Sequence, residues 1–406
     1  DEVNQDYKSQ VTNLNNQVQN YQNAKSVVNN INNSDLDSAI RNAKSTPGVK
    51  LINDGTKTIT ATMDNYADKK AEIERSNKKQ ADDINAQLQQ YKSALEEYKK
   101  KLTSDEIDPN EIKQLLILGN ETSARMSWES LTNNGEFIPN TDKYIYHDDD
   151  GHLRGGVTAT NIYFRAKSSA DVQGNILKVT YDNLKNSSYN GQKITKIVQI
   201  YHDITKTPND PEIPAILVWS NPFNGFWYWH SDAISVDYHL YLENGEELNI
   251  PSTGLDGKHS DAWITVGSLN SGSWRTEGAA LESTGKAYEF NGSTVTIHNN
   301  NWLYSDNANE WYPGNPETFS ASGNKNDSKI ATIPMAWDTG LSNPYAYIGA
   351  GVFNIFGKGY SIRYTTDHAN GKSTLETWAN MSTSIVKSNS GIIPPEIHYN
   401  YTNVAL

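Results

Sequence analysis

All ten tryptophans of this 406-residue chain lie at residue 128 or later, and this uneven distribution divides the chain into two kinds of sequence. The first hundred residues carry two long heptad seams, which predict helices. Beyond residue 128, alternating stretches such as 176–181 and 234–242 are separated by Asn-Gly turns at 190–191 and 244–245. Many short strands between turn signals predict an all-β sandwich or barrel.

Both predicted helices carry one apolar stripe on an otherwise polar surface. The two stripes contain Val11, Leu14, Val18, Tyr21, Val28 and Ile31 in the first helix, and Ala81, Ile84, Leu88, Tyr91, Leu95, Tyr98 and Leu102 in the second. A helix with a single stripe needs a partner to be stable. We therefore expect an antiparallel coiled-coil hairpin as a stalk, with a turn and a short β-ribbon at its tip; a partner-binding coiled coil is the alternative.

These patterns give three expected segments: a helical stalk at 1–105, a β domain at 106–392 and an extended exit segment at 393–406. The net charge of −13 disfavours nucleic acid as a partner, because phosphate binding uses clustered Lys and Arg. The absence of cysteine excludes disulfides, thiol catalysis and cysteine-bound zinc. No apolar run is long enough to span a membrane, and no signal peptide or anchor is visible, so we expect a piece of a longer protein.

Residues 219–232 concentrate three Trp, one Tyr and two Phe among turn-forming and polar residues. Exposed rings beside short polar groups are typical of sugar sites, because a pyranose has apolar faces and bidentate hydroxyls. The candidate ligand residues here are Trp219, Asn221, Asn224, Trp227, Trp229 and Asp232. The alternative is a core strand at 226–229, since aromatic residues dominate protein cores.

Strand geometry places Trp227 and Trp229 on one side and Tyr228 on the other, with the two indoles about 6.5–7 Å apart along the strand. Trp302 and Trp311 lie in two similar turn-rich clusters and complete the set of candidate ligand residues. Four other tryptophans stand in more strand-like runs and are expected in the core: Trp263, Trp274, Trp337 and Trp378.

The densest acidic run spans residues 147–152 and contains Asp148 and Asp150. Closely spaced oxygen ligands suit a structural Ca²⁺, although the run lacks a full EF-hand pattern. A solvated hairpin turn is the alternative interpretation. The sequence contains no Gly-x-Ser-x-Gly, no His-Glu-x-x-His and no phosphate-binding glycine loop, and we expect no enzymatic activity.

Residues 177–196, LKVTYDNLKNSSYNGQKITK, resemble the stretch VTYTNLKNSYYNGKKISK of the streptococcal antigen I/II variable domain. Residues 43–49 and 57–59 are similar to the alanine-rich repeats of that family, and residues 349–352 to a segment near the end of its domain. The chain thus resembles the Gram-positive surface adhesins that comprise antigen I/II, the enterococcal aggregation substances and glucan-binding protein C. The single stalk hairpin is most similar to the last of these.

The resemblance implies a lectin-like β-supersandwich on a helical stalk, in a protein anchored to the cell wall. It also implies a non-enzymatic adhesin that binds carbohydrate, foremost an α-glucan such as dextran, in adherence and biofilm formation. Two alternatives remain open at this point: a polyanion, either extracellular DNA or lipoteichoic acid, and a salivary or other host glycoprotein. The family's binding residues are not matched motif by motif, so the candidate residues above come from their chemistry alone.

Overall fold

The computed structural model describes residues 1–101, 106–107, 112–138, 145–147, 153–155, 161–254, 256–272, 275–305, 309, 337–338, 340–367, 377–385 and 394–406. The chain forms two compact units. One unit comprises Asp1–Glu97 and Ile392–Leu406, and the other comprises Tyr98–Gly391. The second unit is therefore inserted between two parts of the first.

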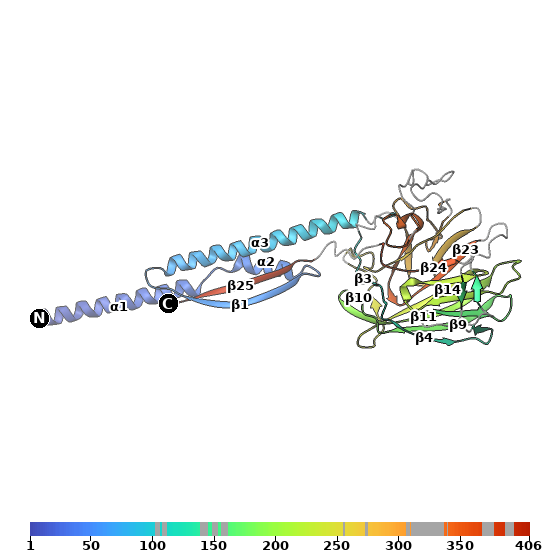
Figure 1. Cartoon of the computed structure of the whole chain (residues 1–406). Helices are drawn as coiled ribbons and strands as arrows, with labels where there is room; N and C mark the ends of the chain where they lie inside the picture. The colour runs from blue at the N-terminus through green and yellow to red at the C-terminus, as the bar shows by residue number, and fades with distance from the viewer. Residues whose placement is uncertain are drawn as a thin grey trace. The chain divides into compact units, whose positions relative to one another are not determined.

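The N-terminal unit contains three helices and a pair of strands (Figure 1). Their bounds are α1 (Glu2–Asn29), α2 (Ser34–Lys44), β1 (Lys50–Thr60), α3 (Tyr66–Lys101) and β25 (Glu396–Ala405). Strands β1 and β25 pair in parallel, from Lys50 opposite Glu396 to Thr60 opposite Ala405. The C-terminal segment, expected as an extended exit, is thus a strand that returns to the unit where the chain begins.

The apolar stripe of α3 has a different partner from the one expected. Its Ala81, Ile84 and Leu88 pack against α2 and against Ile397 of β25. Among the described contacts, the two long helices do not form the expected antiparallel pair. The reason is that α2, with its buried Leu36, Ala39 and Ala43, and the strand pair take the place of α1.

Helix α1 uses only the end of its stripe inside the unit. Val28 is 3% exposed and packs with Ala61, Ile73 and Val404, whereas Tyr7 is 67% and Leu14 59% exposed. The heptad pattern therefore predicted the helix correctly but gave no information on what its N-terminal part contacts. None of the helices in the described ranges combines the length and apolar character needed to cross a membrane.

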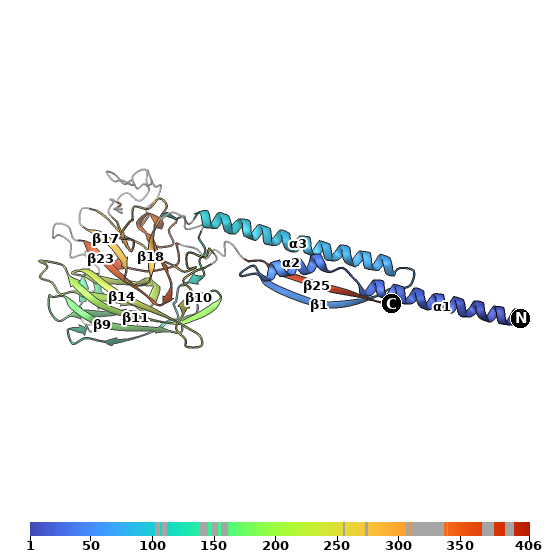
Figure 2. The ribbon, with the colours of Figure 1, turned by 180° about the vertical axis from the view of Figure 1, so that it is seen from behind.

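The second unit is built on a ten-stranded, antiparallel sheet. Its main path runs β19 (Thr296–His298), β20 (Trp302–Tyr304), β17 (Thr276–Leu281), β23 (Tyr360–Asp367), β14 (Ser231–Leu242), β11 (Gln192–Lys206), β9 (Val172–Asp182) and β4 (Arg125–Ser130). Two short strands, β10 (Ser187–Tyr189) and β3 (Leu116–Ile117), continue from one end of β11. Figure 2 shows β17, β23, β14, β11 and β9 side by side in this sheet.

A five-stranded sheet contains the aromatic stretch 219–232. Its order is β24 (Thr377–Ala379), β13 (Phe226–Trp229), β12 (Ala215–Trp219), β8 (Asn161–Ala166) and β5 (Gly135–Phe137). The turn between β12 and β13 is the short helix η2 (Pro222–Asn224). A four-stranded sheet joins β16 (Trp263–Val266), β21 (Gly351–Ile355), β18 (Gly285–Phe290) and β2 (Glu106–Ile107), and η3 (Ala346–Gly349) precedes β21. Two two-stranded sheets, β15 (Asn249–Ile250) with β22 (Gly357–Lys358) and β6 (Ile145–His147) with β7 (Leu153–Gly155), complete the described strands of the unit.

The core lies between the ten-stranded and five-stranded sheets. Phe226 of the smaller sheet contacts Tyr201 and Tyr364 of the larger sheet edge-on, with ring centroids 5.0 Å and 5.3 Å apart. Alternating residues of both sheets enter one continuous apolar cluster, which is the packing that defines a sandwich. The predicted all-β sandwich with an N-terminal helical unit is confirmed.

Candidate functional site

The aromatic stretch 219–232 forms two strands of the five-stranded sheet and splits its rings between the two faces. Phe226 and Tyr228 point into the sandwich core, where both are 1% exposed. Trp227 and Trp229 point to the opposite face, together with Trp219. The predicted alternation is therefore what the strand shows, and its physical cause is the two-residue period of β-structure.

Burial separates the two members of the expected tryptophan pair. Trp229 is fully buried in a second apolar cluster with Ile138, Leu217 and Tyr163, and Tyr163 packs edge-on against it at 6.1 Å. Trp227 is only half-buried at the margin of that cluster. Trp229 is therefore a core residue, and its ring is not accessible to a sugar.

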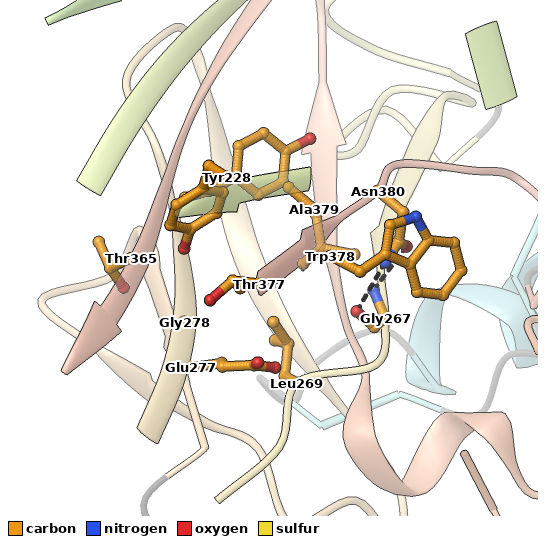
Figure 3. A pocket seen from close by; sticks show the side chains of 12 residues that line it. Tyr228, Gly267, Leu269, Glu277, Gly278, Thr365, Thr377, Trp378, Ala379 and Asn380 are labelled. Carbon is orange, nitrogen blue, oxygen red and sulfur yellow. Dashed lines mark hydrogen bonds between the residues drawn. The ribbon is translucent and has the colours of Figure 1, made fainter. Parts of the chain in front are cut away.

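The neighbour that Trp227 has instead is Trp378, a residue expected in the core. The two are directly opposite each other in β13 and β24, and both are half-buried. Directly opposed residues on antiparallel strands have Cβ atoms about 4.5–5.5 Å apart. Figure 3 shows the Trp378 indole pointing away from Tyr228, Thr365 and Thr377. The outer face of the five-stranded sheet thus presents two partly exposed indoles on adjacent strands.

Two residues of the aromatic stretch hold Trp378 in place. The backbone carbonyl of Asn224 accepts a hydrogen bond of 2.7 Å from the indole Nε1, and the Asn224 side chain is exposed. Gly225 has a φ of +73°, and a Cβ there would lie 2.1 Å from the carbonyl oxygen of Ala379 and 2.9 Å from the indole Nε1 of Trp378. Only glycine allows this left-handed turn and this close approach. The turn therefore brings an exposed amide next to a partly exposed indole.

The other predicted ligand residues have varied environments. Asn221 is 9% exposed and caps η2, accepting a hydrogen bond from the Phe223 amide, so its side chain has a structural role. Trp219 is half-buried beside the same apolar cluster, and Asp232 is half-buried at the start of β14. Trp311, Asp148 and Asp150 lie outside the described residues, as does Trp274.

Two of the tryptophans expected in the core are there, since Trp263 is fully buried and Trp337 is 1% exposed. Trp302 is half-buried on the ten-stranded sheet, far along the topology from the other candidates. Sequence reasoning missed Trp378 because the exposure of a strand residue depends on its neighbours in the sheet. No local signal gives the register between β13 and β24, which are separated by almost 150 residues.

A small cavity lies behind this face, between β13, β17, β23 and β24 (Figure 3). Its volume of about 10 Å³ is the room of a single water molecule. The Tyr228 hydroxyl bonds to Thr366 Oγ1, which in turn lies 3.0 Å from Thr377 Oγ1. Burial raises the pKa of Tyr228, so the phenol stays protonated. This cavity is part of the core and has no space for a sugar ring.

Glu277 is a buried carboxylate at the edge of the cavity, and Asn270 links it to the half-buried carboxylate of Asp338. Glu277 accepts a hydrogen bond of 2.8 Å from the Asn270 amide and lies 3.2 Å from Nε of Arg275. The Asn270 side chain donates to Asp338, which Ser268 also contacts through a hydrogen bond of 2.8 Å. Burial raises the pKa of both carboxyl groups, and the Arg275 guanidinium opposes that rise. Within the described ranges, no group of three or more His, Asp or Glu side chains is placed to hold a metal ion.

Comparison with known proteins supports the family resemblance found in residues 177–196. The profile of the family "Glucan-binding protein C" matches residues 99–382, and that of the family "Adhesin P1 N-terminal domain" matches residues 22–114. Among solved structures, glucan-binding protein C of Streptococcus mutans, described as mediating sucrose-independent and sucrose-dependent adherence, is 18% identical, with a TM-score of 0.45. That match covers 94% of this chain and 98% of the relative.

The adhesin domain of PrgB from Enterococcus faecalis matches in two structures. The DNA-bound form is 18% identical with a TM-score of 0.46, covering 67% of this chain and 96% of the relative. The form without DNA is 17% identical with a TM-score of 0.44, covering 67% and 90%. The family profile spans more than half of the chain, which confirms the resemblance found in the sequence. The chain belongs to the glucan-binding protein C family, a family of adhesins.

Proposed function

We propose that this protein is a cell-surface adhesin that binds an α-glucan of the dextran type on the outer face of its five-stranded sheet. The observation that carries the proposal is the pair of half-buried indoles, Trp227 and Trp378, opposite each other on adjacent strands. Flat rings at this spacing offer stacking surfaces to the C–H faces of a pyranose. The exposed Asn224 amide beside Trp378 supplies a donor and an acceptor for vicinal hydroxyls.

A shallow site of this kind binds weakly, because only one side of each sugar contacts protein. Removal of one stacking ring is expected to cost about 1–3 kcal/mol, or roughly ten- to a hundredfold in affinity. Binding requires no catalytic group, and the family is one of binding proteins, so we extend the proposal to a non-enzymatic role. Anchoring to the cell wall and a part in biofilm formation belong to the same proposal.

The experiment is calorimetric titration of the whole chain with isomaltotriose and with dextran. Trp227→Ala and Trp378→Ala should each lose about tenfold or more in affinity, while Trp378→Phe should recover part of the loss. Trp128→Ala is the matched control, because Trp128 is 37% exposed but lies on strand β4 of the other sheet. Unchanged dextran affinity in folded Trp227 and Trp378 variants would refute the site. No binding by the parent protein would refute the ligand.

DNA is a second candidate, favoured by the related PrgB adhesin domain, which is described as bound to DNA. The net charge of −13 counts against phosphate binding, but it does not exclude a local basic patch, so the expectation against nucleic acid is not supported. Binding of duplex DNA that weakens steeply with salt, without dextran binding, would favour this candidate. Lipoteichoic acid and a host glycoprotein remain further alternatives for the same adhesin role.

Ca²⁺ at Asp148 and Asp150 remains a proposal based on the acidic run alone. A cation bound only by the folded state raises the melting temperature by mass action. We expect such a rise for the parent chain and its loss in the Asp148→Asn, Asp150→Asn double variant. A rise that persists in the variant would assign Ca²⁺ to other ligands, and a parent chain without any rise would remove it.

A further inference from the structure

The outer face of the ten-stranded sheet carries a straight row of side chains that crosses five strands. Pairing places Trp302 of β20 opposite Ala280 of β17, which is opposite Arg363 of β23. Arg363 is opposite Ser235 of β14, and Ser235 is opposite His202 of β11. Their chain neighbours, such as Leu303, Ala279 and Ile234, are fully buried on the inner face. The row therefore lies on the side of the sheet that faces away from the sandwich core.

The aromatic end of this row is the indole of Trp302, which packs against two neighbouring rings and the backbone of β17. Trp302 is half-buried, and the rings of Tyr304 and His298 lie 4.6 Å and 5.4 Å from it. A Cβ on Gly278 would lie 2.9 Å from the Trp302 Nε1 and 2.8 Å from the Thr365 Oγ1. Glycine at this strand position therefore lets the indole lie close against the backbone of β17.

Two polar atoms at this end are not used by the described part of the protein. Neither the buried Trp302 Nε1 nor the buried Thr365 Oγ1 has a hydrogen-bond partner there. A buried donor or acceptor without a partner costs about 1–3 kcal/mol, and native structures retain few of them. Both atoms lie close to Gly278, so this end of the row contains a donor and an acceptor that the described residues leave without partners.

The opposite end of the row is polar and rigid. The Arg363 guanidinium donates to Ser235 Oγ at 2.9 Å, to the Asp203 carbonyl at 2.8 Å and to Thr205 Oγ1 at 2.8 Å. These bonds hold the planar group at a fixed position on the sheet. His202 Nε2 lies 2.9 Å from an oxygen of Asp237, whose side chain is 32% exposed. Donors and acceptors that are fixed in this way lose little side-chain entropy when a ligand binds.

Small side chains separate the two ends. Ala280 and Gly278 are the β17 residues on this face between the Trp302 indole and Arg363. Three strand spacings lie between Trp302 and Ser235, which is roughly 14 Å at the usual distance between paired strands. The row thus has a flat aromatic ring at Trp302, small side chains at Gly278 and Ala280, and a rigid group of donors and acceptors around Arg363. This order matches the alternating apolar faces and hydroxyl groups of a short sugar chain.

We propose that this row is a second glucan-binding surface, on which Trp302 stacks one sugar unit and the partly exposed Arg363 and Asp237 bind hydroxyls of units further along, while the fully buried Ser235 only holds Arg363 in place. The proposal rests on the proposed function, because it assigns the same neutral polysaccharide to a second face. Two surfaces on one domain let a long chain, or two chains, be held at once. Affinity for long dextran then exceeds affinity for isomaltotriose by an avidity factor.

The test is titration of the whole chain with isomaltotriose and with long dextran, in four variants. Ala280→Gln fills the space between Trp302 and Arg363 without removing any hydrogen bond described above, so it should fold even where Trp302→Ala does not. Both variants should lose about tenfold or more of the dextran affinity. Trp302→Phe should retain most of it. Trp128→Ala, an exposed tryptophan on the same sheet outside the row, should retain all of it.

The outcomes separate the two proposals. Loss of the advantage of long dextran over isomaltotriose in Ala280→Gln, with normal melting, supports the second surface. Parental affinities for both ligands in folded Ala280→Gln and Trp302→Ala overturn the second surface and leave the Trp227–Trp378 site standing. A parent chain that binds neither glucan overturns both proposals.

Discussion

Replacing Trp229 with alanine should destabilise the β unit far more than the same change at Trp227, two residues earlier on strand β13. Trp229 is fully buried, with Tyr163 packed edge-on against it. A tryptophan buries about 150–250 Å² of surface. At about 25 cal/mol per Å² this burial corresponds to roughly 4–6 kcal/mol, as an upper value. Measured costs for truncating large aromatic residues in cores are about 3–5 kcal/mol.

Trp227 is half-buried at the edge of the same cluster, so its truncation should cost about 1–2 kcal/mol by the same area argument. The assay is guanidinium unfolding of the whole chain, followed by near-ultraviolet circular dichroism, for the parent, Trp229→Ala, Trp227→Ala and Trp229→Phe. The phenylalanine variant retains a ring against Tyr163 and should fall between the parent and the alanine variant. Equal losses at the two positions, or a loss below about 1 kcal/mol at Trp229, would show that the assignment of core and surface rings is wrong.

Three further predictions follow from particular residues. Gly225→Ala should destabilise the fold more than Gly245→Ala in thermal melts, because both have positive φ but only a Cβ at 225 meets other atoms; equal losses would show that the close approach is unimportant. The hydrogen bond that His202 donates to the Asp237 carboxylate raises the pKa of His202 to about 9. The unfolding free energy should therefore fall between about pH 6.5 and 9, and His202→Gln should flatten that slope; a variant as pH-dependent as the parent contradicts this. Residues 98–391 should unfold cooperatively by themselves, and a fragment without a cooperative transition contradicts this.

The helical part of the fold shows what a periodic pattern determines. The stripe from Ala81 to Leu102 predicted a helix at about 66–103, and α3 spans Tyr66–Lys101. The pattern did not identify the partner of that stripe, because any apolar surface of matching width can bury the stripe. In the structure the partners include Ile397, which is more than 300 residues away in sequence and follows the inserted β unit.

The candidate site shows the same limit at the level of single residues. Alternation placed Trp227 and Trp229 on one face and Tyr228 on the other, as the structure has them. Alternation cannot say which ring on a face is covered, because that depends on the neighbouring strands. Trp378 became the neighbour of Trp227 through the register of β13 with β24, and that register is a tertiary property.

The resemblance in residues 177–196 supplied the family where the chemistry of single residues did not. That segment forms the end of β9, the turn after it, β10 and the start of β11, all of them strands of the ten-stranded sheet. The same segment contains no tryptophan. It therefore indicates the family and the fold, whereas the candidate ligand surfaces lie on other strands.

The most direct test of the central claim is a titration of the ¹⁵N-labelled whole chain with isomaltotriose, observed through the ten indole N–H signals. Tryptophan-to-phenylalanine variants assign each signal. We predict that the signals of Trp378 and Trp227 shift in proportion to occupancy, while those of the buried Trp229 and Trp263 do not move. Saturable binding measured in the same sample, with the Trp227 and Trp378 signals unchanged, would contradict the account.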